Sequence, residues 1–194
     1  MFISNGNEPD IRLEWFGCKN DDQNLRKLYL KWLNDLKIVQ PIGSKELLNT
    51  NKGCDFIDKS FARFSKSNSI GFFIYYIPDG RYIGTAKLDN ISYYSHSAHD
   101  GIMIGDSRYH GRGIAEKVYK ILLSYAFNKL KMHKIIGVCN IQNTAMVKIF
   151  KKIGYILEGR MRDADIMNSE FSDHLYFGIL EKEFDSHKVK LIII

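Results

Sequence analysis

The chain has 194 residues, of which 45% are hydrophobic and three are proline, a length and composition typical of one compact domain with a buried core. The net charge of +6 indicates no partner by itself, and the opening MFISNGNEPD has neither the basic start nor the apolar run of a signal peptide. Three scattered cysteines without a C-x-x-C pair exclude a common zinc or redox motif, so we expect a cytoplasmic protein.

The first half of the chain carries signals for a strand, two helices and a hairpin. Residues 11–16 (IRLEWF) alternate as a strand does, and apolar residues at helical spacing over 24–35 predict an amphipathic helix. A second helical region is expected between Ser44, as its N-cap, and Phe64. The turn PDGR at 78–81, between two runs of aromatic and β-branched residues, predicts a β-hairpin.

The second half alternates strands and helices. In chain order we expect a strand over 97–106 with glycines at 101 and 105, a helix over 114–130, a buried strand over 134–139, a helix over 143–154, and two antiparallel strands at 155–159 and 173–184. The final VKLIII is far shorter than the ~20 residues of a membrane span, so we expect no membrane contact and interpret it as an edge strand or an interface. A mixed α/β (α+β) sheet with helices on its faces fits this order.

Positive charge is concentrated in one part of the chain. From Arg108 to Arg162 there are 12 Lys or Arg residues and only two acidic ones, Glu116 and Glu158. Either this part meets a polyanion or it is a solvated basic face. The charges interleave with apolar helix positions and no aromatic RNA-binding motif is present, so we expect no nucleic-acid partner.

The stretch DSRYHGRGIA, residues 106–115, has the composition of a phosphate cradle. Glycines let backbone N–H groups approach an anion, and a helix that starts there adds its positive end. A Walker loop is absent, and a dinucleotide fingerprint fails because Glu116 stands at its third glycine. The alternative is an ordinary glycine-rich turn without a ligand.

What remains is an R-x-x-G-x-G pattern, Arg108 to Gly113, between a strand and a helix. With it, the sequence resembles the GNAT superfamily of acetyl-CoA-dependent N-acetyltransferases. The segments AHDGIMIGDSRYHGRGIAEKVYKILLSYAF, NTAMVKIFKKIGYILEGRMRD and DHLYFGIL, with KWLND and YIG, are similar to signatures of the branch that contains ribosomal-protein N-terminal and spermidine acetyltransferases. The resemblance covers 11–184, leaves a short tail at 185–194, and implies a single domain over 1–194 with a mostly antiparallel central sheet and helices on both faces.

The resemblance also implies acetyl-CoA as cosubstrate and assigns its contacts. Met103 and Ile104 would pair through their backbone with the pantetheine arm. The pyrophosphate would lie on the loop and helix start, which comprise Arg108, Tyr109, His110, Gly111, Arg112, Gly113, Ile114 and Ala115. Asn143 would contact the cofactor or serve only as a helix cap. Phe150 occupies the place where many relatives carry a tyrosine that donates a proton to the CoA sulfur, and Met146 replaces a common serine. Tyr119 and Tyr155 can substitute for that tyrosine only if the fold brings them close, and a CoA-binding protein without catalysis remains an alternative.

An amine must lose a proton before it attacks a thioester, because alkyl amines are protonated at pH 7. Alignment with the family places His99 where relatives carry a strand carboxylate, with Asp100 beside it on the opposite face of the strand. His99, Asp100 and water remain three alternative proton acceptors. An H-x-x-H formed by His96 and His99 has no third ligand nearby, so we expect no metal.

The acceptor is expected to be a small-molecule primary amine on an anionic carrier, such as a nucleotide-linked amino sugar, because Arg160 and Arg162 add positive charge. The alternatives are a polyamine or a protein N-terminus. Glu158 and Asp173 are expected to form ion pairs between the closing strands. The oligomeric state is left open, with a homodimer as one option.

Overall fold

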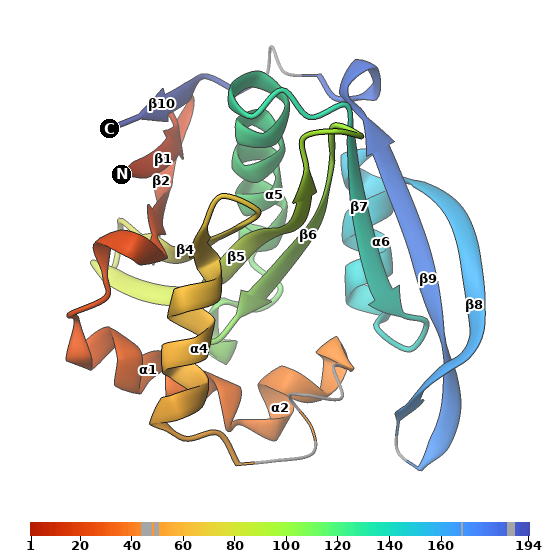
Figure 1. Cartoon of the computed structure of the whole chain (residues 1–194), viewed down its shortest axis with the longest axis horizontal. Helices are drawn as coiled ribbons and strands as arrows, with labels where there is room; N and C mark the ends of the chain where they lie inside the picture. Colours follow the sequence, from red (N-terminus) through yellow and green to blue (C-terminus); the bar gives the residue numbers. More distant parts are fainter. Residues whose placement is uncertain (44–47, 49–50, 168, 186–188) are drawn as a thin grey trace.

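The computed structural model describes residues 1–43, 48, 51–167, 169–185 and 189–194. Its strands form one ten-stranded sheet that runs through the molecule (Figure 1). The strands are β1 (Phe2–Asn5), β2 (Glu8–Trp15), β3 (Ser65–Lys66), β4 (Ser69–Tyr76), β5 (Arg81–Ser92), β6 (Ser97–Ile104), β7 (Lys134–Asn140), β8 (Ile156–Met167), β9 (Glu170–Leu180) and β10 (Leu191–Ile193).

The order across the sheet is β10-β1-β2-β4-β5-β6-β7-β9-β8, and β3 pairs with β4 off this path. Every pairing is antiparallel except that of β6 with β7, which is parallel. The expected mixed, mostly antiparallel sheet is therefore confirmed.

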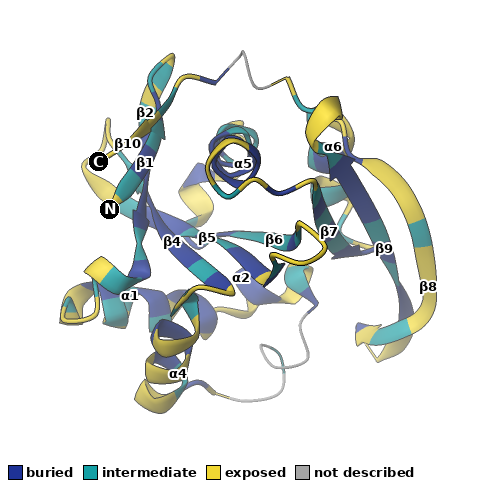
Figure 2. Ribbon diagram, turned by 45° about the horizontal axis from the view of Figure 1, so that its top comes forward, coloured by how far each residue is buried: buried dark blue, intermediate teal, exposed yellow. Residues whose placement is uncertain are grey.

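Helices cover both faces of the sheet, as expected. They are α1 (Gln23–Leu33), α2 (Leu36–Val39), the short 3-10 turn η2 (Gln40–Ile42), α4 (Cys54–Phe64), α5 (Ile114–Ser124) with a π-helical extension η4 (Tyr125–Lys129), and α6 (Thr144–Ile153). Figure 2 shows α5 on one face of β4, β5 and β6, and α1, α2 and α4 on the other. No helix in the described ranges is long and apolar enough to cross a membrane.

Helix α1 forms where the sequence predicted it and packs through its apolar side. The Asp22 side chain accepts a hydrogen bond from the Leu25 amide at 2.9 Å and so caps the first turn. Leu25, Tyr29 and Trp32 are buried in a cluster that also contains Phe73 from β4. This cluster holds α1 against the sheet and so positions the walls of the site described below.

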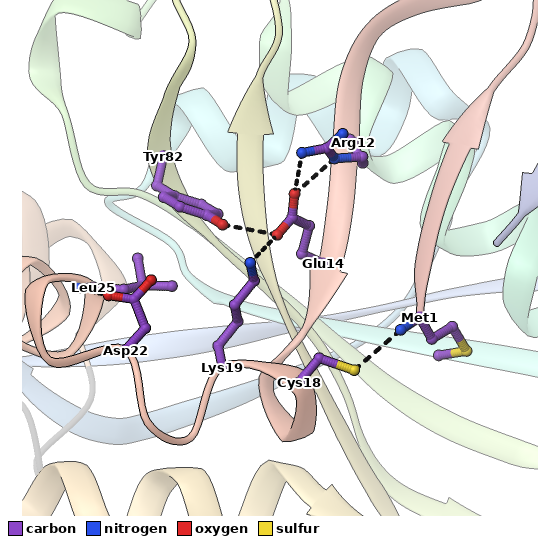
Figure 3. Close-up of polar contacts among 8 residues, drawn as sticks. All are labelled: Met1, Arg12, Glu14, Cys18, Lys19, Asp22, Leu25 and Tyr82. Atoms are coloured by element: carbon purple, nitrogen blue, oxygen red, sulfur yellow. Dashed lines mark hydrogen bonds and ion pairs between the residues drawn. The ribbon is translucent and has the colours of Figure 1, made fainter.

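A polar cluster on Glu14 anchors the loop between β2 and α1 (Figure 3). The buried Glu14 carboxylate accepts bonds from Arg12 and from the Tyr82 hydroxyl at 2.7 Å, and pairs with the Lys19 ammonium at 2.7 Å. Burial raises the pKa of Glu14, but these partners outweigh it and leave the pKa below its ordinary value. The cluster ties the start of α1 to β2 and β5.

The structure adds one strand and places two other expected segments. Strand β1, which the sequence did not predict, has four residues and pairs with β2. Helix α4 (Cys54–Phe64) lies within the region expected to be helical, and Ser44, its expected N-cap, lies outside the described residues. The terminal VKLIII contributes β10, an edge strand on β1, which was one of the two interpretations of that segment.

Candidate functional site

The site begins where two neighbouring strands separate. The parallel pairing of β6 with β7 ends at His99 and Ile136, although β6 continues to Ile104 and β7 to Asn140. The two strands diverge beyond that point, as Figure 1 shows. Backbone groups of β6 from Gly101 onward are therefore released from β7 and can bind something else.

The glycine loop follows directly after β6 and leads into α5. Gly111 and Gly113 have φ angles of 72° and 74°, in the left-handed region that favours glycine, and a Cβ atom on either would meet nothing within 4 Å. No side chain caps α5, so the amides of its first turn are available to a ligand. The loop thus has the bare backbone and the free helix start of an anion site.

A cavity of about 460 Å³ lies over this loop, and we name it the α5/α6 cavity. Nine of the residues expected to bind the cofactor line it: Met103, Ile104, Tyr109, His110, Gly111, Gly113, Ile114, Ala115 and Asn143. Lys148 from α6 and Lys37 from α2 add positive charge to its wall, whereas Lys152 pairs at 2.7 Å with Glu116, which also lines the cavity. Part of the basic segment identified in the sequence therefore faces this cavity.

Three other residues expected at the cofactor are placed differently. The Arg108 guanidinium pairs with Asp106 at 2.6 Å and is exposed. Arg112 stacks over the Tyr109 ring at 5.3 Å. Phe150 is buried and packs against Tyr155, with ring centroids 4.8 Å apart. None of the three is among the residues that line the α5/α6 cavity.

The sequence analysis missed the contribution of the segment after α1, in which it recognised no chemistry. Lys37, Ile38, Pro41 and Ile42, from α2 and η2, line the α5/α6 cavity opposite α6. Asn143 holds this segment to α6, because its Nδ2 donates to the Pro41 carbonyl at 2.8 Å. No local pattern could have revealed this contact, which joins residues 102 positions apart.

Asn143 has the cap role that the sequence offered as one of two alternatives. Its Oδ1 accepts a hydrogen bond from the Met146 amide at 3.1 Å, so Asn143 caps the helix as well as lining the cavity. The two roles that the sequence left as alternatives are compatible.

A second cavity, of about 410 Å³, lies on the other face of the sheet, and we name it the α1/α4 cavity. Its walls come from α1, α4 and the facing residues of β4, β5 and β6, and they are mainly apolar, with Phe16, Leu33 and Phe56 among them. Lys59, Arg63 and Lys87 bring positive charge to it.

The two cavities share three lining residues, Ile42, Ile102 and Met103. Two of these belong to β6, directly after the point where β6 leaves β7. A molecule in one cavity can therefore meet a molecule in the other at the gap between the two strands.

The fold brings both candidate tyrosines to Asp100. The Tyr155 hydroxyl donates to Asp100 Oδ2, and the Tyr119 hydroxyl lies 3.3 Å from Asp100 Oδ1. Both rings also contact Phe150. Burial raises the pKa of Asp100 to about 7, against the two tyrosine bonds, which lower it. Asp100 is thus a carboxyl group that holds or releases a proton near neutral pH.

His99 lies on the opposite face of β6 from Asp100, on the side of Gly101 and Met103. It is half-buried, and burial lowers its pKa, which favours the neutral imidazole that can accept a proton. Neither His99 nor Asp100 is among the residues that line the two cavities.

Several charged residues of the closing strands form ion pairs within the protein. Arg160 donates to Asp173 across β8 and β9, which is the ion pair expected for Asp173. Glu158 pairs instead with Lys134 of β7 at 2.7 Å. Neither Arg160 nor Arg162 is among the residues that line the two cavities, so they add no charge to the cavity walls.

Comparison with known proteins identifies relatives of this architecture. The family model described as an acetyltransferase (GNAT) domain matches residues 19–156. An uncharacterised N-acetyltransferase of Bacillus subtilis is 28% identical over 101 residues, which cover 50% of this chain and 59% of that protein. The spermidine N(1)-acetyltransferase of Vibrio cholerae is 23% identical over 155 residues, which cover 80% of this chain and 89% of that protein.

A solved structure has the same fold. The crystal structure of spermidine N-acetyltransferase from Vibrio cholerae in complex with CoA and spermine superimposes with a TM-score of 0.79 at 19% identity, covering 91% of this chain and 98% of that chain. At this identity the likeness establishes the fold alone.

Proposed function

The chain belongs to the GNAT acetyltransferase family, and from that premise we propose that it transfers the acetyl group of acetyl-CoA to the primary amine of a small molecule. The observation that carries this proposal is the junction at Ile102 and Met103, where the cavity over the glycine loop meets a mainly apolar cavity on the other side of the sheet.

The residues of the α5/α6 cavity suit acetyl-CoA, which supplies an activated acetyl thioester when bound. Backbone amides from Gly111 to Ala115 would hold the pyrophosphate, because the bare loop leaves room for it and the uncapped helix start favours negative charge. Lys148 would add positive charge to this cavity. Met103 and Ile104, on the part of β6 that is no longer paired with β7, would contact the amide-containing arm, and the Ile104 carbonyl lies 2.9 Å from His110 Nε2.

The α1/α4 cavity would hold the acceptor, since it opens onto the same junction from the opposite face. Holding both reactants at one point replaces a collision in solution by a reaction between neighbours, which is a large part of catalysis in such transfers.

His99 is the better of the two candidate groups for taking the amine proton. It lies on the face of β6 that carries the α1/α4 cavity and is kept neutral by burial, so it acts directly or through a water molecule. Asp100 lies on the other face with Tyr119 and Tyr155, beside Phe150. There it is suited to protonating the departing thiolate, which needs little help because a thiol is a modest acid.

Two classes of acceptor were expected from the sequence, a nucleotide-linked amino sugar and, as an alternative, a polyamine. A nucleotide-linked amino sugar was expected from Arg160 and Arg162, but Arg160 is bound to Asp173 and neither arginine is among the cavity-lining residues. A polyamine is favoured by the name of the Vibrio cholerae relative.

Gly111 provides the first test, because Asp and Asn are isosteric and both tolerate its left-handed backbone. We expect Gly111→Asp to weaken acetyl-CoA binding at least tenfold more than Gly111→Asn, since only Asp places a negative charge where the pyrophosphate would lie. Titration by thermal shift or calorimetry measures both affinities, and wild-type stabilisation of about 2.7 kcal/mol is expected at a hundredfold excess over Kd. Equal affinities in the two variants, or no wild-type shift with saturating acetyl-CoA, would contradict the cofactor assignment.

A further inference from the structure

The α1/α4 cavity is positively charged. Among its described lining residues, Lys59, Arg63 and Lys87 carry positive charge and none carries a carboxylate. The carboxylate of Asp89, which is 4% exposed, lies close by, and the charge of Lys87 also acts on Asp100; neither acid is among those lining residues. Asp89 pairs with Arg63 at 2.5 Å and with Lys87 at 3.2 Å.

These pairs leave net positive charge at the cavity. One carboxylate shared by Arg63 and Lys87 balances only one of their two charges. Both side chains also remain accessible, at 50% and 40% exposure, and so can contact a ligand as well as Asp89. Lys59 lies 4.0 Å from Asp55, and at 82% exposure this contact is weak.

Lys87 brings this charge close to the reacting end of the cavity. It is paired in register with Gly101 of β6, and its carbon chain lies over that glycine, because a Cβ on Gly101 would come within 2.9 Å of Lys87 Cε. Gly101 directly precedes Ile102 and Met103, where the two cavities meet. An anionic group on Lys87 would therefore lie about two residues, roughly 7 Å, from the junction.

A polyamine suits these surroundings poorly. Its several ammonium groups would meet the positive charges of Lys59, Arg63 and Lys87, and like charges repel each other. A molecule with one amine and one anionic group avoids this cost, because its anion pairs with the cations while its amine reaches the junction.

We propose that the α1/α4 cavity selects acceptors that carry a carboxylate or phosphate within a few bonds of the primary amine, and that Lys59, Arg63 and Lys87 recognise that anion. This assignment rests on the proposed function and narrows its substrate class. A nucleotide-linked amino sugar carries phosphate and is compatible with this class only if its phosphate lies near enough to the amine.

Matched amine pairs test the proposal. Phosphoethanolamine is compared with ethanolamine, methionine with methioninamide, and spermidine serves as the polycation, with released CoA as the readout. We expect at least one anionic member to exceed its neutral partner tenfold or more in kcat/KM, and to exceed spermidine. Spermidine as the best substrate, or equal rates within both pairs, would overturn the assignment.

Charge reversal at one cavity residue is the second test of the proposal. Lys59→Glu should raise KM for the preferred anionic amine about fivefold or more and leave KM for its neutral partner nearly unchanged, because Lys59 is largely exposed and free of a strong partner. Lys31→Glu is the matched control, since Lys31 is an exposed lysine of α1 that is not among the cavity-lining residues. Equal effects of the two variants would mean that the overall charge is responsible and the cavity is not.

The outcomes separate this inference from the proposed function. If acetyl-CoA causes no thermal shift, the proposed function itself is wrong. If acetyl-CoA binds but no amine in the panel turns over, the same pairs are compared by thermal shift in the presence of CoA. Stabilisation by an anionic member, lost in Lys59→Glu, supports the cavity assignment, whereas no stabilisation by any anionic member overturns it.

Discussion

At the scale of single residues, the neighbours His99 and Asp100 have opposite environments. Alternation along β6 directs the two side chains to opposite faces of the sheet. Burial shifts the pKa of each group in the direction that favours its neutral form. The direction is downward for His99 and upward for Asp100. One strand therefore offers a proton acceptor on one face and a proton donor on the other near neutral pH.

The raised pKa of Asp100 predicts a pH-dependent stability. The unfolded chain loses this proton near pH 3.8, whereas the folded protein keeps it up to about pH 7. Between these values the folded state binds more protons, so the contribution of Asp100 to the free energy of unfolding falls as pH rises, by at most about 1.4 kcal/mol per pH unit. Asp100→Asn should remove this fall, as measured by urea denaturation at several pH values from 4.5 to 8.

His99→Ala is the control, and its effect has the opposite sign. A lowered folded-state pKa makes wild-type stability rise with pH below about 6.5, and the variant loses that rise.

In the activity assay, His99→Ala should lower kcat/KM by roughly 10²- to 10⁴-fold. If His99→Ala is fully active and Asp100→Asn is inactive, the proton acceptor is the carboxyl group.

At the scale of elements, the site depends on how α6 meets η2. Asn143 caps α6 through its Oδ1 and holds Pro41 of η2 through its Nδ2, and both elements line the α5/α6 cavity. One amide side chain thus couples the start of a helix to the opposite wall of the cavity.

Substitution of Asn143 separates these two bonds. Asn143→Ser keeps a good N-cap but is too short to reach Pro41, whereas Asn143→Ala removes both interactions. We expect Asn143→Ala to lose about 1 kcal/mol of unfolding free energy and Asn143→Ser to lose less. Both should weaken acetyl-CoA binding to a similar degree in a calorimetric titration. Tighter binding by Asn143→Ser than by Asn143→Ala would show that the helix cap, and not the link to Pro41, shapes the cavity.

At the scale of the whole molecule, the two ends of the chain close one side of the sheet. Strand β10 pairs with β1, and Phe2 and Ile194 exchange both backbone hydrogen bonds, at 2.7 and 3.0 Å. The ends therefore lie together at the edge of the sheet opposite β8, as Figure 1 shows. This edge is distant in strand order from the gap between β6 and β7.

Deletion of residues 189–194 should affect stability more than cofactor binding. It removes the buried Val189 side chain and the hydrogen bonds of β10, which together contribute roughly 2–4 kcal/mol, and leaves β1 as an unpaired edge that favours aggregation. Acetyl-CoA affinity at a temperature where the variant is folded should be unchanged. Ile194→Ser is the control, because this exposed side chain can change while the backbone pairing stays. A large loss of affinity in the deletion variant would contradict the separation of edge and site.

The sequence by itself determined the local structure of the cofactor loop. Gly111 and Gly113 before a periodic apolar helix predicted a bare anion site, and the structure shows left-handed glycines and an uncapped helix there, because backbone freedom and helix periodicity are local properties. The helix cap at Asn143 was likewise readable from the chain.

Tertiary structure alone decided which distant groups meet. The tyrosine missing at Phe150 left Tyr119 and Tyr155 as candidates, and only packing of α5 and of the segment after α6 against β6 brings both hydroxyls to Asp100. The charge of the α1/α4 cavity was equally hidden, since Lys59 and Lys87 come from a helix and a strand and face one space only after α4 packs on the sheet. Sequence patterns report periodicity within one element, whereas the contacts that define a site are set by how elements pack, and that depends on the whole chain.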